Sequence, residues 1–423
     1  MPAPRIDPPT TVTFFFPYHL VSGVPFLFAR MAQALGARGY DCIVVDYPNG
    51  CLANLTQGAP GVRLMPFEAG ESLRVPADSL LVMQGILPAT LRPELNIAPE
   101  TRVAFWVLHA MNFVQTLIPT TWGRHLQTRY PSVQHLANHT VMRMHTKRLG
   151  SFLEEVHCQH SLWFMDGSTL DTTRRYLDVA LSDPTLLPVL VDVPADNPRR
   201  LSEKQPLTAA WLGRLDDFKV SILNHTLRAI ERHAAARGQE VVMRVVGEGP
   251  LEQQVVTPNP RHVIMERLGT LTGDSLTRAL SSSDVLFAMG TSALEGARRG
   301  VPTVLLDYSY GAVPAHYRFR WLFTADRDEL GRLIDADLVG PEGGTVSPIF
   351  DALALDAAGL SQKSFEYCRD HHSIDCGVER FLAAAGRARF TWGGIPAALR
   401  NKGLTRRLYE HVRARRLLVP SSN

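Results

Sequence analysis

The sequence is poor in cysteine and contains no long hydrophobic run, and both absences narrow the classes to which it can belong. Its five cysteines are scattered and form no C-x-x-C pair. An odd, dispersed set argues against a disulfide framework and against a structural zinc site. The aromatic run Phe14–Phe16 is far too short to span a bilayer, and residues 1–9 lack the apolar segment of a secretion signal. We therefore expect a cytoplasmic protein.

Repeats and common nucleotide-binding motifs are also missing. The sequence shows no repeat of about 20–50 residues, no low-complexity tract and no Walker motif. Its net charge is +3, but nine basic residues and only one acid follow Gly386, so the rest of the chain carries about −5. That distribution argues against nucleic-acid binding by the main body.

The first part of the chain alternates apolar strands with helical segments. A length of 423 residues, with 45% hydrophobic and 20% charged residues, indicates a globular protein of about two or three domains. The apolar runs predict strands at 11–17, 42–45, 62–65, 80–83 and 103–108, and helical spacing predicts a helix at 26–35. Such alternation favours a parallel sheet that helices cover on both faces.

A proline-rich segment at 183–198 interrupts this pattern, which then starts again. Strands are predicted at 208–212, 241–246, 285–288 and 303–306, and helices at 221–236 and 274–280. We therefore predict an α/β protein of two doubly wound, Rossmann-like domains facing a cleft. The predicted parts are an N-terminal domain at 1–183, a linker at 184–200, a C-terminal domain at 201–385 and a basic helical tail at 386–423.

The most informative stretch is 283–306, which predicts a strand, a turn, a short helix and a second strand. Gly290 allows a tight turn, Thr291 or Ser292 can cap the helix, and the first amides of the helix can receive an anion. Glu295 follows Ser292 by three residues. That spacing fits a capping-box glutamate and equally a carboxylate that accepts from two sugar hydroxyls.

Other polar residues stand at predicted strand ends. Arg214 and Lys219 follow the strand at 208–212, where two cations could bind an anion or simply lie in solvent. His109 follows the strand at 103–108, and it is either a ligand-facing residue or a hydrogen-bonded core histidine. Asp166 precedes Gly167 and Ser168, and we interpret it as a helix cap.

Five short motifs in the second half occur in a characteristic order. They are Gly213-Arg-Leu-x-x-x-Lys219, Val246-Gly-Glu-Gly-Pro250, Leu268-Gly-Thr-Leu271, Ser283-Asp-Val285 and Ser292-Ala-Leu-Glu-Gly-Ala-x-x-Gly-Val-Pro302. Their order and spacing resemble the donor domain of family 4 glycosyltransferases, which have the GT-B fold. The resemblance covers about 205–310 well and 11–46 loosely. It implies a cytoplasmic enzyme of glycan synthesis that uses a nucleoside-diphosphate sugar, with no metal ion or cofactor.

The resemblance also implies roles for individual residues. Arg214 and Lys219 would neutralise the diphosphate, Glu295 would hold the ribose, and the turn Gly290-Thr291-Ser292 would offer amides to the diphosphate or sugar. In the N-terminal half, Gly23 would lie near the diphosphate and His109 near the donor sugar. Fixed cations suit this chemistry because a departing nucleoside diphosphate develops negative charge.

Two positions depart from the family pattern. Phe287 occupies the place of a glutamate that commonly touches the transferred sugar, and Val220 replaces the glycine after the lysine. The leading prediction is a retaining, metal-independent glycosyltransferase acting on a glycan or lipid-linked acceptor. A nucleotide-sugar epimerase would need paired carboxylates, of which the sequence gives no convincing sign. A non-catalytic nucleotide-sugar binder is supported only by Phe287.

The basic tail allows two interpretations. Apolar residues from Trp392 to Leu418 recur at spacings that could form one helical face between the arginines. The segment is either a C-terminal helix packed on the N-terminal half, or an attachment to an anionic membrane surface.

Overall fold

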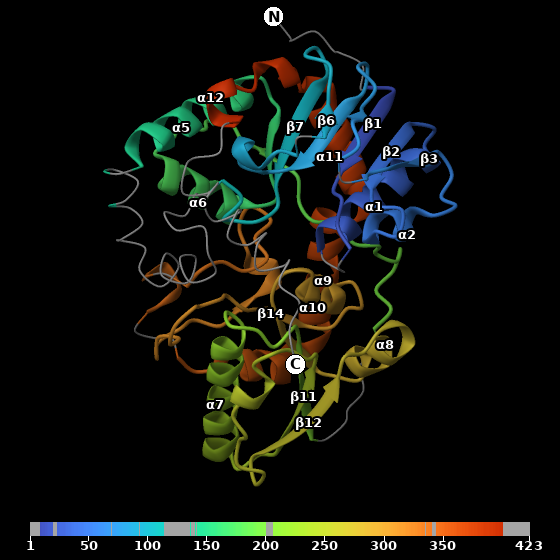
Figure 1. The fold of residues 1–423 in the computed structure, drawn as a ribbon. Helices are drawn as coiled ribbons and strands as arrows, with labels where there is room; N and C mark the ends of the chain where they lie inside the picture. The colour runs from blue at the N-terminus through green and yellow to red at the C-terminus, as the bar shows by residue number, and fades with distance from the viewer. Residues whose placement is uncertain are drawn as a thin grey trace, which may run out of the picture. The chain divides into compact units, whose positions relative to one another are not determined.

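The structure, a computed structural model, describes residues 9–19, 23–68, 70–92, 94–113, 136, 140, 142–199, 206–334, 336–340 and 344–400 (Figure 1). The chain divides into two compact units. Unit 1 comprises Met1–Leu187 and Val378–Asn423, and unit 2 comprises Pro188–Gly377. In the described residues no helix is long and apolar enough to cross a membrane.

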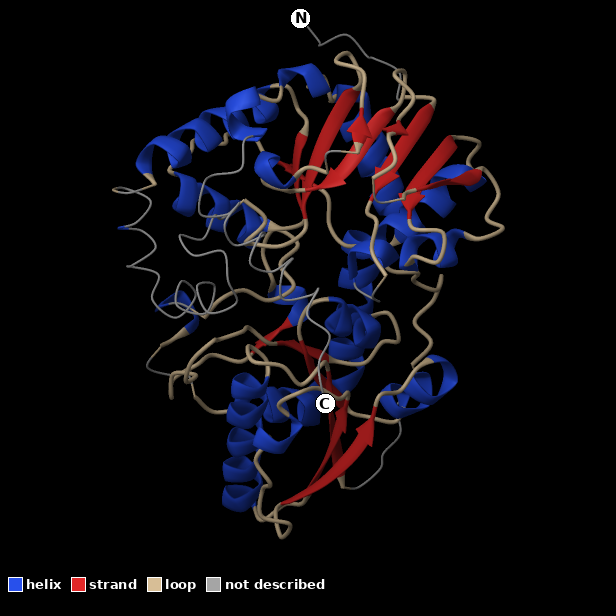
Figure 2. Cartoon of the chain, viewed as in Figure 1, coloured by secondary structure: helices blue, strands red, loops and turns tan. Residues whose placement is uncertain are grey.

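Unit 1 is built on a seven-stranded parallel sheet in the order β3-β2-β1-β5-β7-β8-β9 (Figure 2). Its strands are β1 (Thr11–Phe15), β2 (Asp41–Asp46), β3 (Val62–Pro66), β5 (Leu80–Gln84), β7 (Arg102–Val107), β8 (Leu162–Phe164) and β9 (Thr185–Leu186). Its helices include α1 (Gly23–Ala37), α2 (Cys51–Thr56), α5 (Arg143–Cys158) and α6 (Gly167–Leu177). The two-strand sheet β4 (Leu73–Arg74) and β6 (Leu95–Asn96) completes it. The central strands are buried because runs such as Arg102–Val107 are apolar on both faces, whereas the edge strand β3 is partly exposed.

The chain returns to unit 1 through α11 (Ile374–Arg387), which packs into the core of that unit through Phe381. Phe381 packs against Phe14, Trp106 and Trp163, with ring centroids 5.8, 6.2 and 5.5 Å away. Unit 2 therefore ends at Gly377, whereas the sequence placed the boundary at 385. At the other crossing, Leu187 lies within the predicted linker, 184–200.

The described part of the tail belongs to the core of unit 1. Trp392, Ile395 and Leu399 are buried there, and the amide of Phe390 donates to Ser161 Oγ at 3.0 Å. The short helix α12 (Ala397–Arg400) ends this part. Six of the nine tail cations fall in 401–423, outside the described residues. For residues 386–400 the structure thus agrees with the packed interpretation.

Unit 2 has a six-stranded sheet in the order β12-β11-β10-β13-β14-β15. Five strands are parallel: β10 (Leu207–Leu212), β11 (Val241–Val246), β12 (Val263–Gly269), β13 (Val285–Ala288) and β14 (Thr303–Leu305). The edge strand β15 (Arg320–Trp321) is antiparallel to β14. The main helices are α7 (Val220–Arg237), α8 (Gly273–Ser281), α9 (Thr291–Ala297) and α10 (Ser347–His372). The predicted α/β architecture with a doubly wound sheet in each half is confirmed.

Candidate ligand site at the carboxyl edge of the second sheet

The loops after β10, β11 and β12 are joined by backbone hydrogen bonds beyond the ends of the strands. Leu215 N donates to Glu248 O at 3.0 Å, and Gly247 N donates to Gly269 O at 2.7 Å. Close approach requires glycine at two positions. A Cβ on Gly247, whose φ is +127°, would lie 2.1 Å from Gly213 O, and one on Gly249 would lie 2.2 Å from Leu215 O. The loops therefore form one rigid block.

This block carries Arg214 and Lys219, the two cations that were predicted from the sequence to bind a ligand. Arg214 is exposed, and Lys219 lies half-buried directly before α7 with its Nζ 5.3 Å from the centroid of the Phe218 ring. Within the described ranges no carboxylate comes within ion-pair distance of either side chain. Burial, followed by the charge of Arg214, lowers the pKa of Lys219, while Asp216 opposes both. Both cations are thus available to an anionic ligand.

Asp216 lies between these cations and is itself unusual. Its Oδ1 is buried and finds no hydrogen-bond partner among the residues that the structure describes. Burial is the main cause that raises the pKa of this carboxyl, with Lys219 and Arg214 acting in the opposite direction. The loop therefore holds one poorly solvated acid beside two cations.

The turn after β13 supplies backbone groups at the same edge. Gly290 has a φ of +61°, which glycine adopts without strain, and its amide donates to Leu330 O at 2.6 Å. No side chain caps the start of α9, Thr291 is exposed and Ser292 is half-buried. The prediction that Thr291 or Ser292 caps this helix is therefore wrong, because α9 begins immediately after the glycine.

Glu295 is held by two arginines rather than by a helix cap. Its Oε2 lies 2.8 Å from Arg298 Nε and 2.5 Å from Arg299 Nη1. Gly290 precedes the helix, so Glu295 stands beyond the position that a capping box requires. Burial alone would raise its pKa, but the Arg299 hydrogen bond and the charges of both arginines lower it. Glu295 is thus an ionised carboxylate, and the capping-box interpretation is excluded.

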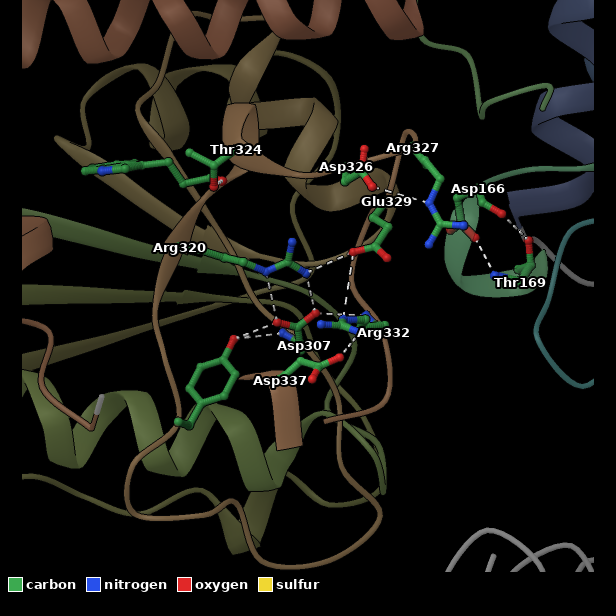
Figure 3. Close-up of polar contacts among 12 residues, drawn as sticks. Asp166, Thr169, Asp307, Arg320, Thr324, Asp326, Arg327, Glu329, Arg332 and Asp337 are labelled. Carbon is green, nitrogen blue, oxygen red and sulfur yellow. Dashed lines mark hydrogen bonds and ion pairs between the residues drawn. The ribbon is translucent and has the colours of Figure 1, made fainter. Parts of the chain in front are cut away.

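A buried charged network behind this turn was not predicted from the sequence (Figure 3). Asp307, which is fully buried, accepts from Arg320 Nη2 at 2.8 Å, from the amide of Arg332 at 2.9 Å and from the Tyr317 hydroxyl at 3.1 Å. Arg320 also lies 3.5 Å from Glu329. The network holds the segment that contains Leu330, the acceptor for Gly290. Its only signal in the sequence is an aspartate directly after an apolar strand.

Phe287 lies inside β13 and is fully buried. Its ring packs against Phe319 and Phe350, with centroids 6.1 and 6.3 Å away. This position belongs to the core of unit 2, so a side chain there does not contact a ligand at the sheet edge. In this chain a buried core residue of β13 thus stands where the resemblance implied a sugar-contacting glutamate.

Unit 1 contains the two remaining predicted site residues. His109 follows β7, and its Nδ1 accepts from the amide of Met111 at 3.1 Å, which leaves Nε2 to carry the proton of the neutral ring. Burial lowers its pKa although part of the residue is exposed. Gly23 is the first residue of α1, and a Cβ there would meet no atom within 4 Å. Asp166 caps α6 as expected, accepting from Thr169 N at 2.7 Å (Figure 3).

The predicted residues thus fall on two sheet edges. Arg214 and Lys219 lie in the loop after β10, whereas the turn at Gly290 and helix α9 with Glu295 follow β13, the neighbouring strand of unit 2. Gly23 and His109 follow β1 and β7 of unit 1. Among the described residues no group of three or more histidine, cysteine or acidic side chains is placed to hold a metal ion.

Comparison with known proteins identifies the fold. No family model and no curated protein sequence matches this chain. A glycosyltransferase from Rickettsia africae ESF-5 superposes with a TM-score of 0.54 at 9% identity, covering 89% of this chain and 97% of that one. WaaG, a glycosyltransferase of lipopolysaccharide biosynthesis, gives 0.47 at 14% identity over 88% and 98% of the chains. The galactosyltransferase WaaB gives 0.42 at 10% over 88% and 98%. The first likeness shows that the chain has the GT-B fold.

Proposed function

We propose that this protein is a glycosyltransferase that moves a sugar from a nucleoside-diphosphate donor to a glycan or lipid-linked acceptor. The observation that carries the proposal is the pair Arg214 and Lys219. These cations are unpaired within the described chain and stand at the carboxyl edge of a parallel sheet in a GT-B fold. Open α/β sheets bind ligands at this edge.

The chemistry of the donor explains why two such cations are useful. Breaking the bond between the sugar and the diphosphate leaves negative charge on the departing phosphate oxygen. Arg214 and Lys219, which form no ion pair in the described residues, stabilise that charge in the transition state. We assign the same task to the amides of Thr291 and Ser292, since the amide of Gly290 already donates to Leu330 O. The proposed transfer is metal-independent and retains the configuration of the sugar.

Glu295 completes the proposed donor site. Arg298 and Arg299 both contact its Oε2 and keep the carboxylate ionised, so Oε1 can accept from the ribose hydroxyls. Gly23 and the neutral His109 are proposed contributions from unit 1 to the diphosphate and the donor sugar. The acceptor is proposed to be part of a cell-surface glycan, and the cations of 401–423 are proposed to reach an anionic membrane.

The decisive experiment measures release of nucleoside diphosphate. The protein is screened against nucleotide sugars by thermal shift, since a ligand at 100 times its Kd stabilises by about 2.7 kcal/mol. With the donor so identified, adding acceptors should release nucleoside diphosphate in step with glycosylated product. Donor binding without any acceptor-dependent release would favour a non-catalytic binder. Conversion of the donor to an epimer would indicate an epimerase.

A further inference from the structure

The carboxyl edge of the sheet in unit 1 carries a second set of side chains that the proposed donor chemistry does not use. It is formed by His19 after β1, Tyr47 after β2, Phe67 after β3, and Arg92 in the segment that follows β5. Strands β1, β2 and β3 are neighbours in the sheet (Figure 1). These four residues, the aromatic–arginine patch, therefore meet at one edge although they are distant in sequence.

The rings of the patch pack in a row that starts in the core, where Phe67 is fully buried, and ends at the surface with His19. The His19 and Tyr47 rings are stacked, with centroids 4.2 Å apart and planes 12° apart. Tyr47 in turn meets Phe67 edge to face at 5.5 Å. His19 is exposed and Tyr47 is half-buried, so the row reaches solvent. The exposed His19 ring and the half-buried Tyr47 ring can pack against a ring in a ligand.

Arg92 is fixed against these rings by two contacts. Its Cζ lies 5.5 Å from the centroid of the Phe67 ring, and its Nη2 donates to the Tyr47 hydroxyl at 3.4 Å. Arg92 is exposed, and no described carboxylate lies within ion-pair distance of its guanidinium. A guanidinium held in place and lacking an acid partner suits a phosphate or carboxylate, which it can bind through two parallel hydrogen bonds.

The backbone beneath the patch is fixed by the buried carboxylate of Asp46. Its Oδ1 accepts from the amides of Tyr18 and Tyr47 at 2.7 and 2.8 Å, and its Oδ2 accepts from Leu52 and Ala53 at 2.8 and 3.1 Å. One side chain thus ties together the loop after β1, the loop after β2 and the start of α2. The backbone at Tyr47 and next to His19 is therefore held in place without a ligand, which reduces the entropy lost on binding.

We propose that the aromatic–arginine patch binds a sugar ring that carries a phosphate or carboxylate group, as the acceptor of the transfer. This identification of the acceptor rests on the proposed function, whereas the binding itself does not. The rings accommodate the apolar face of the sugar and Arg92 binds its anionic group. A neutral sugar lacks the charged contact, and a free anion lacks the aromatic one.

The test measures binding of four probes to the full chain by calorimetry: glucose 6-phosphate, glucuronate, glucose and inorganic phosphate. The measurements use the Arg214→Ala/Lys219→Ala variant, so that the cations of unit 2 cannot bind the anions. We expect the phosphorylated sugar, the acidic sugar or both to bind at least tenfold more tightly than glucose and than phosphate. Which of the two binds identifies the anionic group.

Two substitutions and one control locate the binding. Arg92→Gln should weaken binding of the anionic sugar at least tenfold, whereas Arg74→Gln, which changes another exposed arginine of unit 1, should not. Tyr47→Leu should weaken sugar binding more than phosphate binding. The proposal is overturned if neither anionic sugar binds, if Arg92→Gln binds as well as the parent, or if phosphate alone binds as tightly as the sugars.

Failure of this proposal can be told from failure of the proposed function. Donor binding and donor-dependent release of nucleoside diphosphate are measured separately on the parent protein. If the parent protein transfers sugar to neutral acceptors only and binds no anionic sugar, the proposed function stands and the proposed binding at the patch is refuted. If the protein binds an anionic sugar, Arg92→Gln abolishes that binding, and no nucleotide sugar binds, the patch stands as a binding site and the proposed transferase function is refuted.

Discussion

The two sheet edges are built by different means. In unit 2 the backbone makes the edge, because glycines at 247 and 249 let the loops after β10 and β11 approach within the space that a Cβ would fill. In unit 1 side chains make it, because Asp46 binds four amides and aromatic rings cover the loops. In unit 2 the cations Arg214 and Lys219 lie on the loop that the glycines allow to approach, whereas in unit 1 Arg92 contacts two of the aromatic side chains themselves. We expect substitutions to affect the two edges differently.

The largest effect is expected where the backbone makes the edge. Gly247→Ala would put a Cβ 2.1 Å from a carbonyl oxygen at a φ of +127°. Overpacking and backbone strain each cost about 2 kcal/mol, so the free energy of unfolding should fall by about 4 kcal/mol. Chemical denaturation followed by circular dichroism measures it.

Gly273→Ala is the matched control for this substitution. Gly273 also has a positive φ, +53°, but a Cβ there would meet no atom within 4 Å. Only backbone strain should therefore destabilise this variant, and its free energy of unfolding should fall by about 1–2 kcal/mol. Equal losses at the two positions would show that contact between the loops does not hold the edge of unit 2.

In unit 1, where side chains hold the edge, Asp46→Ala should lower the free energy of unfolding somewhat less than Gly247→Ala does in unit 2. Asp46→Ala leaves buried amides without an acceptor, and each such group costs about 1–3 kcal/mol. Water can replace some of these bonds at the surface, so we expect a loss of about 3 kcal/mol. Asp46→Asn, which keeps one acceptor oxygen, should lose less. A destabilisation below about 1 kcal/mol for the alanine variant would mean that the aromatic rings, and not Asp46, hold this edge.

The cations of unit 2 should affect turnover and not stability. Charge-assisted hydrogen bonds contribute about 1.5–3 kcal/mol, so Arg214→Ala or Lys219→Ala should lower kcat/KM about ten- to a hundredfold. The melting temperature should stay within about 1 °C, because neither side chain has an ion-pair partner in the described residues. Arg261→Ala, which changes an exposed arginine before β12, is the control. Unchanged kinetics in both variants would remove these cations from the donor site.

The difference between the edges also explains how much the sequence could predict. Strands β10, β11 and β13 were predicted to within one residue because their apolar runs are short and a glycine follows each within two residues. The cations and the Gly290 turn were selected for a related reason, since each lies in the segment that follows such a strand. These signals are local in the sequence, so they can be recognised without any knowledge of tertiary contacts.

Features that depend on tertiary contacts were missed. The residues of the aromatic–arginine patch come from four loops and share no spacing. The network around Asp307 joins residues from separate loops and a two-residue strand, β15. Helix α10 is 26 residues long, but its backbone leaves helical geometry at Asp356 and the apolar period is lost there. Glu295 had two interpretations because the sequence did not show that the helix begins directly after Gly290.

The smallest expected effect concerns the pH dependence of stability in unit 2, where two carboxyls should act in opposite directions. The pKa of Glu295 is lowered by Arg298 and Arg299, which outweigh its burial, whereas burial raises the pKa of Glu329 despite Arg320 and Arg332. Glu295 therefore contributes stability above its unfolded pKa of about 4.3, and that contribution is lost as the pH falls through the lowered value. Glu329 contributes below about pH 4.3, and its contribution is lost as the pH rises through the raised value.

Glutamine at each position removes one of these dependences, so the free energy of unfolding is measured between about pH 3 and 7 for both variants. Glu295→Gln should lose less stability than the parent on acidification below about pH 4.3, and it should also weaken nucleotide binding if this carboxylate holds the ribose. Glu329→Gln should lose less stability than the parent as the pH rises from about 4.3. If both variants follow the parent curve, neither carboxyl is coupled to folding. If Glu295→Gln changes the acid limb while nucleotide affinity is unchanged, its ion pairs with Arg298 and Arg299 serve only the fold.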